Sequence, residues 1–144
     1  MPTRTARTAW NGTLQEGSGQ VELSSSKVGT FDVNFPKRAA DDAGGTTSPE
    51  ELIAAAHAAC FAMSLSNEIG KAGGTPHALD VTADVTLGRD DSGLAITGIT
   101  LTVRGEVDGL DADGFQQAAQ AAKVGCPVSK ALAAVDITLD AALD

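Results

Sequence analysis

The chain has 144 residues and a formal net charge of −9; 42% of its residues are hydrophobic and 20% are charged. This length and composition predict a single globular domain, residues 1–144, rather than a disordered chain. The acidic balance argues against nucleic-acid binding, which needs basic clusters, and against an anionic membrane surface. The first ten residues, MPTRTARTAW, lack the apolar segment of a signal peptide, so we expect a cytoplasmic location.

The first third of the chain is typical of short strands. Residues 5–13, 20–26 and 29–35 alternate in polarity and are separated by Gly, Ser and Asn. The following residues, 36–47, contain Pro36, Gly44 and Gly45, and we expect a loop there.

A long helix is predicted to begin at Pro49. Ser48 is a suitable N-cap, Pro49 suits the first helical position, and Glu51 completes a capping box. Glycines 73 and 74 end the helix. Apolar residues lie on nearly all its sides, which predicts a buried helix. One arc of about 100° is polar and contains Glu50, His57, Cys60, Ser64, Asn67, Glu68 and Lys71.

The remaining residues predict a hairpin, two helices and a strand. Residues 79–89 and 94–107 alternate around a turn, and the alternation slips at Gly98, which indicates a bulge. A helix over 112–124, capped by Asp111 or Asp113, is followed by a short helix from Pro127. Residues 135–143 close the chain as a strand. This order of elements predicts an α+β fold.

The two cysteines each have an ordinary and a chemical interpretation. Cys60 could be a small core residue among alanines, but it lies on the polar arc of the helix. Cys126 precedes Pro127 at a predicted N-cap, where backbone N–H groups stabilise a thiolate, although a cysteine is also simply tolerated there. They are 66 residues apart, so a redox pair requires the fold to bring their Cα atoms within about 6 Å.

Three other residues could act on a thiol. Arg38, in the loop before the helix, could lower the pKa of a thiol, and Glu50 could hold the guanidinium in place. An ordinary surface ion pair between Arg38 and Glu50 is the alternative. His57 lies one turn before Cys60 and could be a base or a structural helix histidine.

The segments PEELIAAAHAACF (49–61) and GCPVSKAL (125–132) resemble the OsmC family (osmotically induced protein C), relatives of the organic hydroperoxide resistance proteins. The resemblance extends from AWNGT near the start to the last strand, and His57 and CPVSK are closer to the OsmC branch. It implies antiparallel sheets packed on a long central helix in an intertwined homodimer. It also implies a thiol peroxidase that reduces organic hydroperoxides without a cofactor and is regenerated by a dithiol, for which a lipoyl-type dithiol is a candidate.

Carried over by motif, Cys60 resembles the cysteine that attacks the peroxide and Cys126 the cysteine that resolves it. Glu50 matches the family's glutamate, and Arg38 in FPKR the arginine, with Lys37 as the fallback. Glu50 and Cys60 are about 15 Å apart along an unbroken helix. If Glu50 and Arg38 act directly on a thiol, we expect it to be the thiol of the other subunit, unless the helix breaks or Arg38 reaches far within one chain.

The N-cap position alone makes Cys126 the more acidic thiol, whereas the resemblance makes Cys60 the attacker. Two other functions stay open beside the peroxidase. One is a thiol–disulfide oxidoreductase or redox sensor that acts on a protein partner, and the other is a non-catalytic, ligand-binding stress protein.

Overall fold

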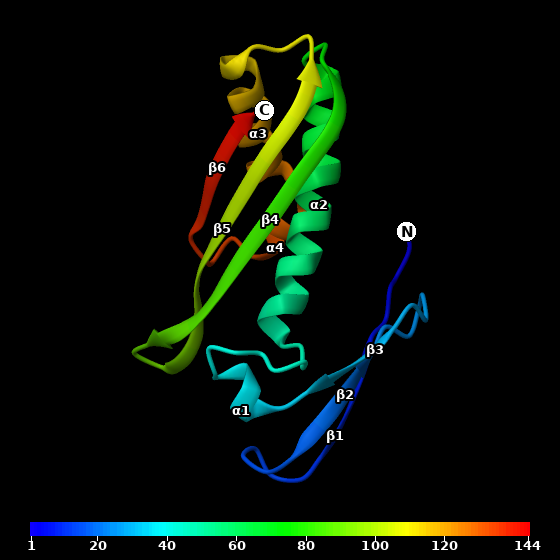
Figure 1. Cartoon of the computed structure of the whole chain (residues 1–144), viewed down its shortest axis with the longest axis vertical. Helices are drawn as coiled ribbons and strands as arrows, with labels where there is room; N and C mark the ends of the chain where they lie inside the picture. Colours follow the sequence, from blue (N-terminus) through cyan, green and yellow to red (C-terminus); the bar gives the residue numbers. More distant parts are fainter. The chain divides into compact units, whose positions relative to one another are not determined.

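The computed structural model describes all 144 residues, which form two compact units, Met1–Pro49 and Glu50–Asp144. The N-terminal unit is an antiparallel meander of three strands in the order β1-β2-β3, drawn in blue in Figure 1. Its strands are β1 (Arg7–Asn11), β2 (Ser18–Glu22) and β3 (Thr30–Val33). The three strands predicted in this region are confirmed.

The segment predicted as a loop begins with one helical turn, α1 (Phe35–Arg38). The Asn34 side chain caps this turn by accepting a hydrogen bond from the Lys37 backbone N–H at 2.8 Å. Pro36 lies in the first turn, where it lacks only an N–H that would have had no helical partner. The loop prediction is therefore wrong for residues 36–38, because a helix-starting proline follows two residues after the N-cap.

The C-terminal unit contains a three-stranded sheet, a long helix and two shorter helices (Figure 1). The sheet has the order β4-β5-β6, and α2 begins at the last residue of the N-terminal unit. The elements are α2 (Pro49–Lys71), β4 (Thr75–Asp90), β5 (Gly93–Asp108), α3 (Ala112–Gly125), α4 (Pro127–Ala131) and β6 (Ile137–Leu143).

The predicted hairpin and its bulge are confirmed. β4 and β5 pair antiparallel along nearly their whole length. Thr86 faces Gly98 while Leu87 faces Ile96, so Thr97 is the extra residue of the bulge. The bulge therefore lies beside Gly98, where the alternation of the sequence slips.

β6 lies parallel to β5, with Ile99 opposite Ile137 and Gly105 opposite Leu143. The prediction of antiparallel sheets thus holds for β1–β3 and for the β4–β5 hairpin but not for β6. The physical reason is the long connection through α3 and α4, which carries the chain back to the starting end of β5.

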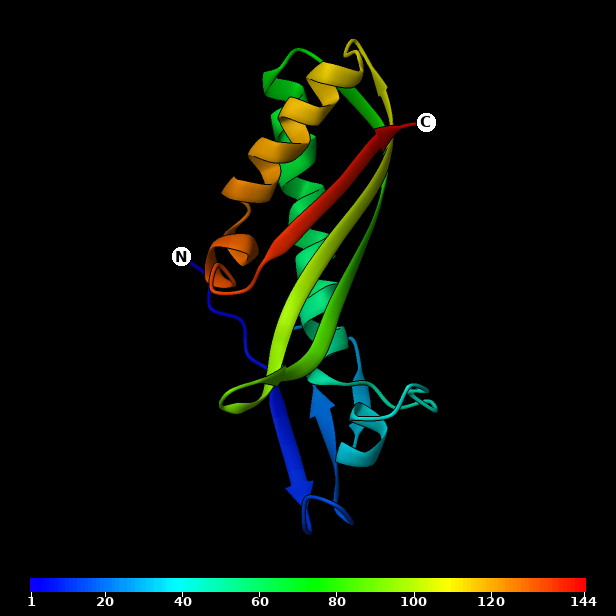
Figure 2. The same cartoon turned by 90° about the vertical axis from the view of Figure 1, so that its left-hand side faces the viewer.

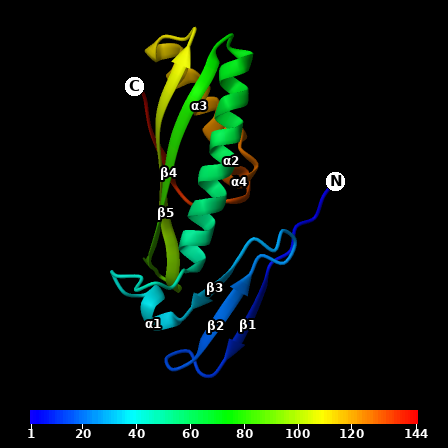
Figure 3. The same ribbon diagram turned by 45° about the vertical axis from the view of Figure 1, so that its right-hand side comes forward.

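The core of the C-terminal unit lies between the sheet and the two longer helices. Figures 2 and 3 show α2 and α3 on the same face of the sheet. The side chains buried there come from α2, β5, α3 and β6: Phe61, Leu65, Ile69, Leu101, Val103, Phe115, Ala118, Ala119, Ala122 and Ala141. Only two aromatic rings belong to this cluster, so small aliphatic side chains provide the rest of the packing.

α2 is buried on one face only. Leu65 and Ile69 are fully buried, whereas Ala56, Ala59 and Met63 are exposed, Met63 to 71%. The prediction of a helix buried on all sides is therefore not met within one chain. By length and composition alone α2 could cross a membrane, but its buried side chains pack in the core described above.

The two glycines end α2 as predicted. Gly73 adopts a positive φ of 88°, a conformation that favours glycine. The Gly74 N–H then donates to the carbonyl of Ile69 at 2.9 Å and the Gly73 N–H to that of Gly70 at 3.1 Å. This pattern is the Schellman motif, and it turns the chain directly into β4.

Candidate dithiol site

The two cysteines meet between α2 and α4. Their sulfur atoms are 2.8 Å apart, and both cysteines are free thiols. Cys60 lies at the middle of α2 and is half-buried, whereas Cys126 is fully buried. The structure therefore meets the requirement that the fold bring the two thiols together, although they are 66 residues apart.

The junction of α3 and α4 fixes the position of Cys126. Its backbone N–H donates to the carbonyl of Ala122 at 2.9 Å, which ends α3, and its carbonyl accepts from the Lys130 N–H at 3.0 Å, which begins α4. Pro127 starts α4, as predicted. The Cys126 sulfur faces Cys60 on α2.

The pKa values of the two thiols are shifted in opposite directions. Burial raises the pKa of the Cys60 thiol, and its hydrogen bond with Cys126 raises it further. Burial also acts to raise the pKa of Cys126, but its hydrogen bonds with Cys60 and Ser129 outweigh it and hold that pKa below its usual value. Within one chain the structure therefore makes Cys126 the more acidic thiol, as its N-cap position predicts.

His57 belongs to the same cluster. Its Nε2 lies 2.8 Å from Ser129 Oγ, both side chains are buried, and Nδ1 has no hydrogen-bond partner. Burial lowers the pKa of His57. Ser129 is a site residue that the sequence interpretation missed. Its spacing of three residues after Cys126, one turn along α4, was the available signal.

An open cavity of about 500 Å³ adjoins Cys60. Its lining is mainly apolar and comes from α2 and the start of α4: Ala56, Ala59, Cys60, Met63, Ser64, Asn67 and Pro127. Cys126 is not part of this lining, so a molecule that enters the cavity meets Cys60 first. Methionine and alanine side chains favour an apolar occupant.

The structure does not bring Glu50 to the thiol of its own chain. Glu50 is buried in the first turn of α2, and α2 is unbroken from Pro49 to Lys71. Ten residues of helix separate Glu50 from Cys60 by about 15 Å along the axis, and this excludes a break in the helix as a route to contact. Arg38 is the last residue of α1 in the N-terminal unit, and Lys37 precedes it.

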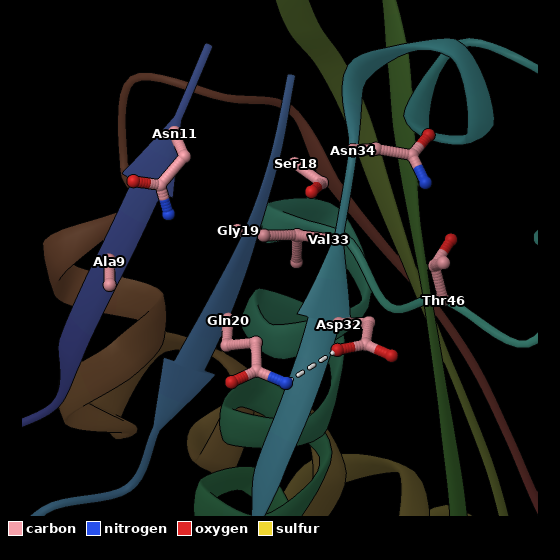
Figure 4. Close-up of a pocket in the computed structure, with 9 residues that line it drawn as sticks. All are labelled: Ala9, Asn11, Ser18, Gly19, Gln20, Asp32, Val33, Asn34 and Thr46. Atoms are coloured by element: carbon pink, nitrogen blue, oxygen red, sulfur yellow. Dashed lines mark hydrogen bonds between the residues drawn. The ribbon is translucent and has the colours of Figure 1, made fainter. Parts of the chain in front are cut away.

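A second hollow of about 430 Å³ lies on the N-terminal unit. Figure 4 shows its lining, in which the Gln20 amide donates to the Asp32 carboxylate at 3.0 Å. Asn34 and Thr46 also line it, and it contains neither cysteine nor histidine.

Two free thiols in contact, one of them beside an open cavity, form a dithiol site. The family model described as OsmC-like protein matches residues 41–140. Peroxiredoxin OsmC of Escherichia coli (strain K12) is 47% identical over 131 residues, covering 91% of this chain and 90% of the relative. The chain therefore belongs to the OsmC-like protein family, and the resemblance seen in the sequence is confirmed.

Other relatives extend this result. Organic hydroperoxide resistance protein OhrA of Bacillus subtilis (strain 168) is 36% identical over 83% of this chain and 85% of its own length. The crystal structure of the organic hydroperoxide resistance protein OhrB of Bacillus subtilis is 31% identical, with a TM-score of 0.75 over 96% of this chain and 98% of that one. The α+β fold with a long helix is thus the fold of these relatives.

Proposed function

We propose that this protein is a thiol peroxidase that reduces organic hydroperoxides to alcohols, in defence against oxidative and osmotic stress. The observation that carries the proposal is the contact of the Cys60 and Cys126 thiols at 2.8 Å beside a cavity with a mainly apolar lining. Relatives named peroxiredoxin OsmC and organic hydroperoxide resistance protein, 47% and 36% identical, support it.

The electrons for the reaction pass through the two thiols and come from an external dithiol. The Cys60 thiolate attacks the distal peroxide oxygen, the O–O bond breaks, and the alcohol leaves with a proton while Cys60 becomes a sulfenic acid. The Cys126 thiol then attacks the Cys60 sulfur, which forms a disulfide and releases water. A dithiol reductant, for which a lipoyl-type dithiol is our candidate, restores both thiols by exchange.

Access supports Cys60 as the attacking thiol, although Cys126 is the more acidic one. Cys60 lines the cavity, whereas Cys126 is fully buried behind it. The low pKa of Cys126 suits a different step, because an acidic thiol leaves more readily when a reductant opens the disulfide. Cys60 then needs a positive charge that its own helix does not supply.

We assign that charge to Arg38 of a second subunit, held in place by Glu50 of that subunit, with Lys37 as the fallback. Two features support a homodimer paired through α2. The helix exposes Ala56, Ala59 and Met63, and about 15 Å of unbroken helix separates Glu50 from the thiol of its own chain. We further propose that residues 1–144 work as one domain, in the cytoplasm.

Steady-state kinetics with an alkyl hydroperoxide and with hydrogen peroxide test this function. We expect dithiol-dependent consumption of the alkyl hydroperoxide with the higher kcat/KM, and its loss in Cys60→Ser. The exposed serine of the same helix, Ser66, provides a control, and Ser66→Ala should keep full activity. Turnover that survives Cys60→Ser would contradict the mechanism. No turnover with any dithiol would favour a redox sensor or a ligand-binding protein.

A further inference from the structure

A repeated spacing joins four buried or half-buried residues across two helices. His57 and Cys60 are one turn apart on α2, and Cys126 and Ser129 are one turn apart on α4. The sulfur atoms are 2.8 Å apart, and His57 Nε2 is 2.8 Å from Ser129 Oγ. His57 is 0% exposed and Ser129 5%, so no solvent substitutes for these contacts.

The supply of protons fixes the direction of the hydrogen bonds. In the proposed arrangement, the single proton of the Ser129 hydroxyl is directed to the sulfur of Cys126, three residues earlier at the start of α4. Ser129 Oγ can then only accept from His57, which places a proton on Nε2 of that imidazole. Nδ1 has no partner and burial disfavours a charge, so His57 is the neutral Nε2–H tautomer.

We propose that His57 and Ser129 are positioning residues for Cys126. The His57 Nε2–H donates to Ser129 Oγ, and the Ser129 O–H donates to Cys126 Sγ, which stabilises the thiolate of this sulfur facing Cys60. The role of Cys126 in resolving a Cys60 sulfenic acid rests on the proposed function, whereas the hydrogen-bond chain from His57 to Cys126 does not.

The arrangement would act twice in the cycle. When the Cys126 thiolate attacks the Cys60 sulfenic acid, its electron pair forms the S–S bond, the S–O bond breaks, and the hydroxide takes up a proton to leave as water. When a dithiol thiolate later attacks the Cys60 sulfur, the S–S bond breaks and Cys126 leaves as a thiolate. The Ser129 hydroxyl stabilises the same negative charge in both steps.

The titratable groups that act on Cys126 are few. Cys60 contacts it directly and His57 acts through Ser129, both from α2. From α3 the Ala122 carbonyl contacts Cys126, and from α4 the backbone of Val128 and Ser129 faces it; none of these groups titrates. The lysines of these helices, Lys123 and Lys130, are half-buried and exposed. A change in the acidity of Cys126 on altering Ser129 or His57 therefore reports this hydrogen-bond chain.

The first test titrates Cys126 alone, in a Cys60→Ser background that leaves it as the single thiol, by ultraviolet absorbance of the thiolate. Ser129→Ala should raise the pKa of Cys126 by about one unit, a roughly tenfold lower thiolate fraction below the pKa. Ser66→Ala, at an exposed position of α2, should leave it unchanged. His57→Phe should shift it in the same direction by less, and His57→Gln, which keeps an N–H donor, should restore it. Equal pKa values in folded Ser129→Ala and Ser66→Ala would overturn the proposal.

The second test needs no substitution in the site. The chain has two histidines, so NMR of histidine labelled with ¹⁵N resolves both rings, and His77→Gln assigns them. We expect His57 as the neutral Nε2–H tautomer at about pH 7, and an Nδ1–H tautomer or an imidazolium would overturn the proposal. Both tests omit peroxide. A failed peroxidase assay with these results would refute only the proposed activity.

Discussion

Acidification should destabilise this protein through His57. The imidazole is buried and neutral, and burial holds its pKa below the ordinary value that it regains on unfolding, about 6.5. Below about pH 6.5 the unfolded chain binds a proton that the folded chain does not, so unfolding becomes easier. The stability that this histidine contributes is thus fully present above about pH 6.5 and lost as the pH falls toward its folded pKa.

The size of the effect follows from the linkage relation. One proton changes the free energy of unfolding by at most about 1.4 kcal/mol per pH unit, so the loss at a pH of about 5.5 is at most about 1.4 kcal/mol. His57→Gln removes the titration but keeps a hydrogen-bond donor for Ser129. When its free energy of unfolding is subtracted from that of the wild type, the contributions of the other acidic and basic groups to the pH dependence cancel.

Urea unfolding at about pH 7.5 and about pH 5.5, at one protein concentration, measures this difference. The advantage of the wild type over His57→Gln should shrink on acidification, by up to about 1.4 kcal/mol. Val124→Ala, at an exposed position of α3 without a titratable group, should keep the pH dependence of the wild type. A difference between wild type and His57→Gln that is the same at both pH values would refute a buried neutral imidazole.

Three further outcomes are expected. Phe61→Ala should lower the free energy of unfolding by about 3–5 kcal/mol, because the ring is fully buried in the core. Val124→Ala, at an exposed position, should change it by no more than about 0.5 kcal/mol, and urea unfolding measures both. Cys126→Ser, treated with excess organic hydroperoxide, should accumulate sulfinic and sulfonic acid at the remaining thiol, as seen by mass spectrometry, and protection equal to wild type would contradict a resolving role. Arg38→Ala should move the pH profile of peroxide consumption to higher pH because a cation near the thiolate is lost, while Lys37→Ala should not; the reverse result would make Lys37 the residue concerned.

The secondary structure of this chain could largely be predicted because its signals are local. The glycines after α2, the proline that begins α4 and the slip at Gly98 each determine a feature within a few residues. The sequence did not predict α1, although Asn34 and Pro36 are its local signal. Gly44 and Gly45 follow within ten residues and favour a loop for the whole segment.

Features that depend on distant residues could be predicted only in part. The parallel pairing of β6 follows from the path of the chain through α3 and α4, and the length of that connection was the available signal. The burial of α2 was overestimated because an alanine-rich helix has similar hydropathy on every side, whether or not each side is covered.

The candidate site shows the same limit. Cys60 and Cys126 could each be singled out from their local position, but their contact depends on how α4 packs against α2. The pairing of His57 with Ser129, 72 residues apart, has no local signal except the matching one-turn spacings from the two cysteines. From the sequence alone, His57 could be a base or a structural residue. Its contact with Ser129, which only the structure shows, determines which of these roles it can have.

The central claim is that Cys60 and Cys126 work as a redox pair. Peptide mapping by mass spectrometry under non-reducing conditions tests it most directly, after the reduced protein meets one equivalent of an organic hydroperoxide. The structure predicts one intrachain disulfide between Cys60 and Cys126, because their sulfur atoms are already in contact. Two free thiols after the peroxide has been consumed, or a disulfide between chains, would contradict the claim.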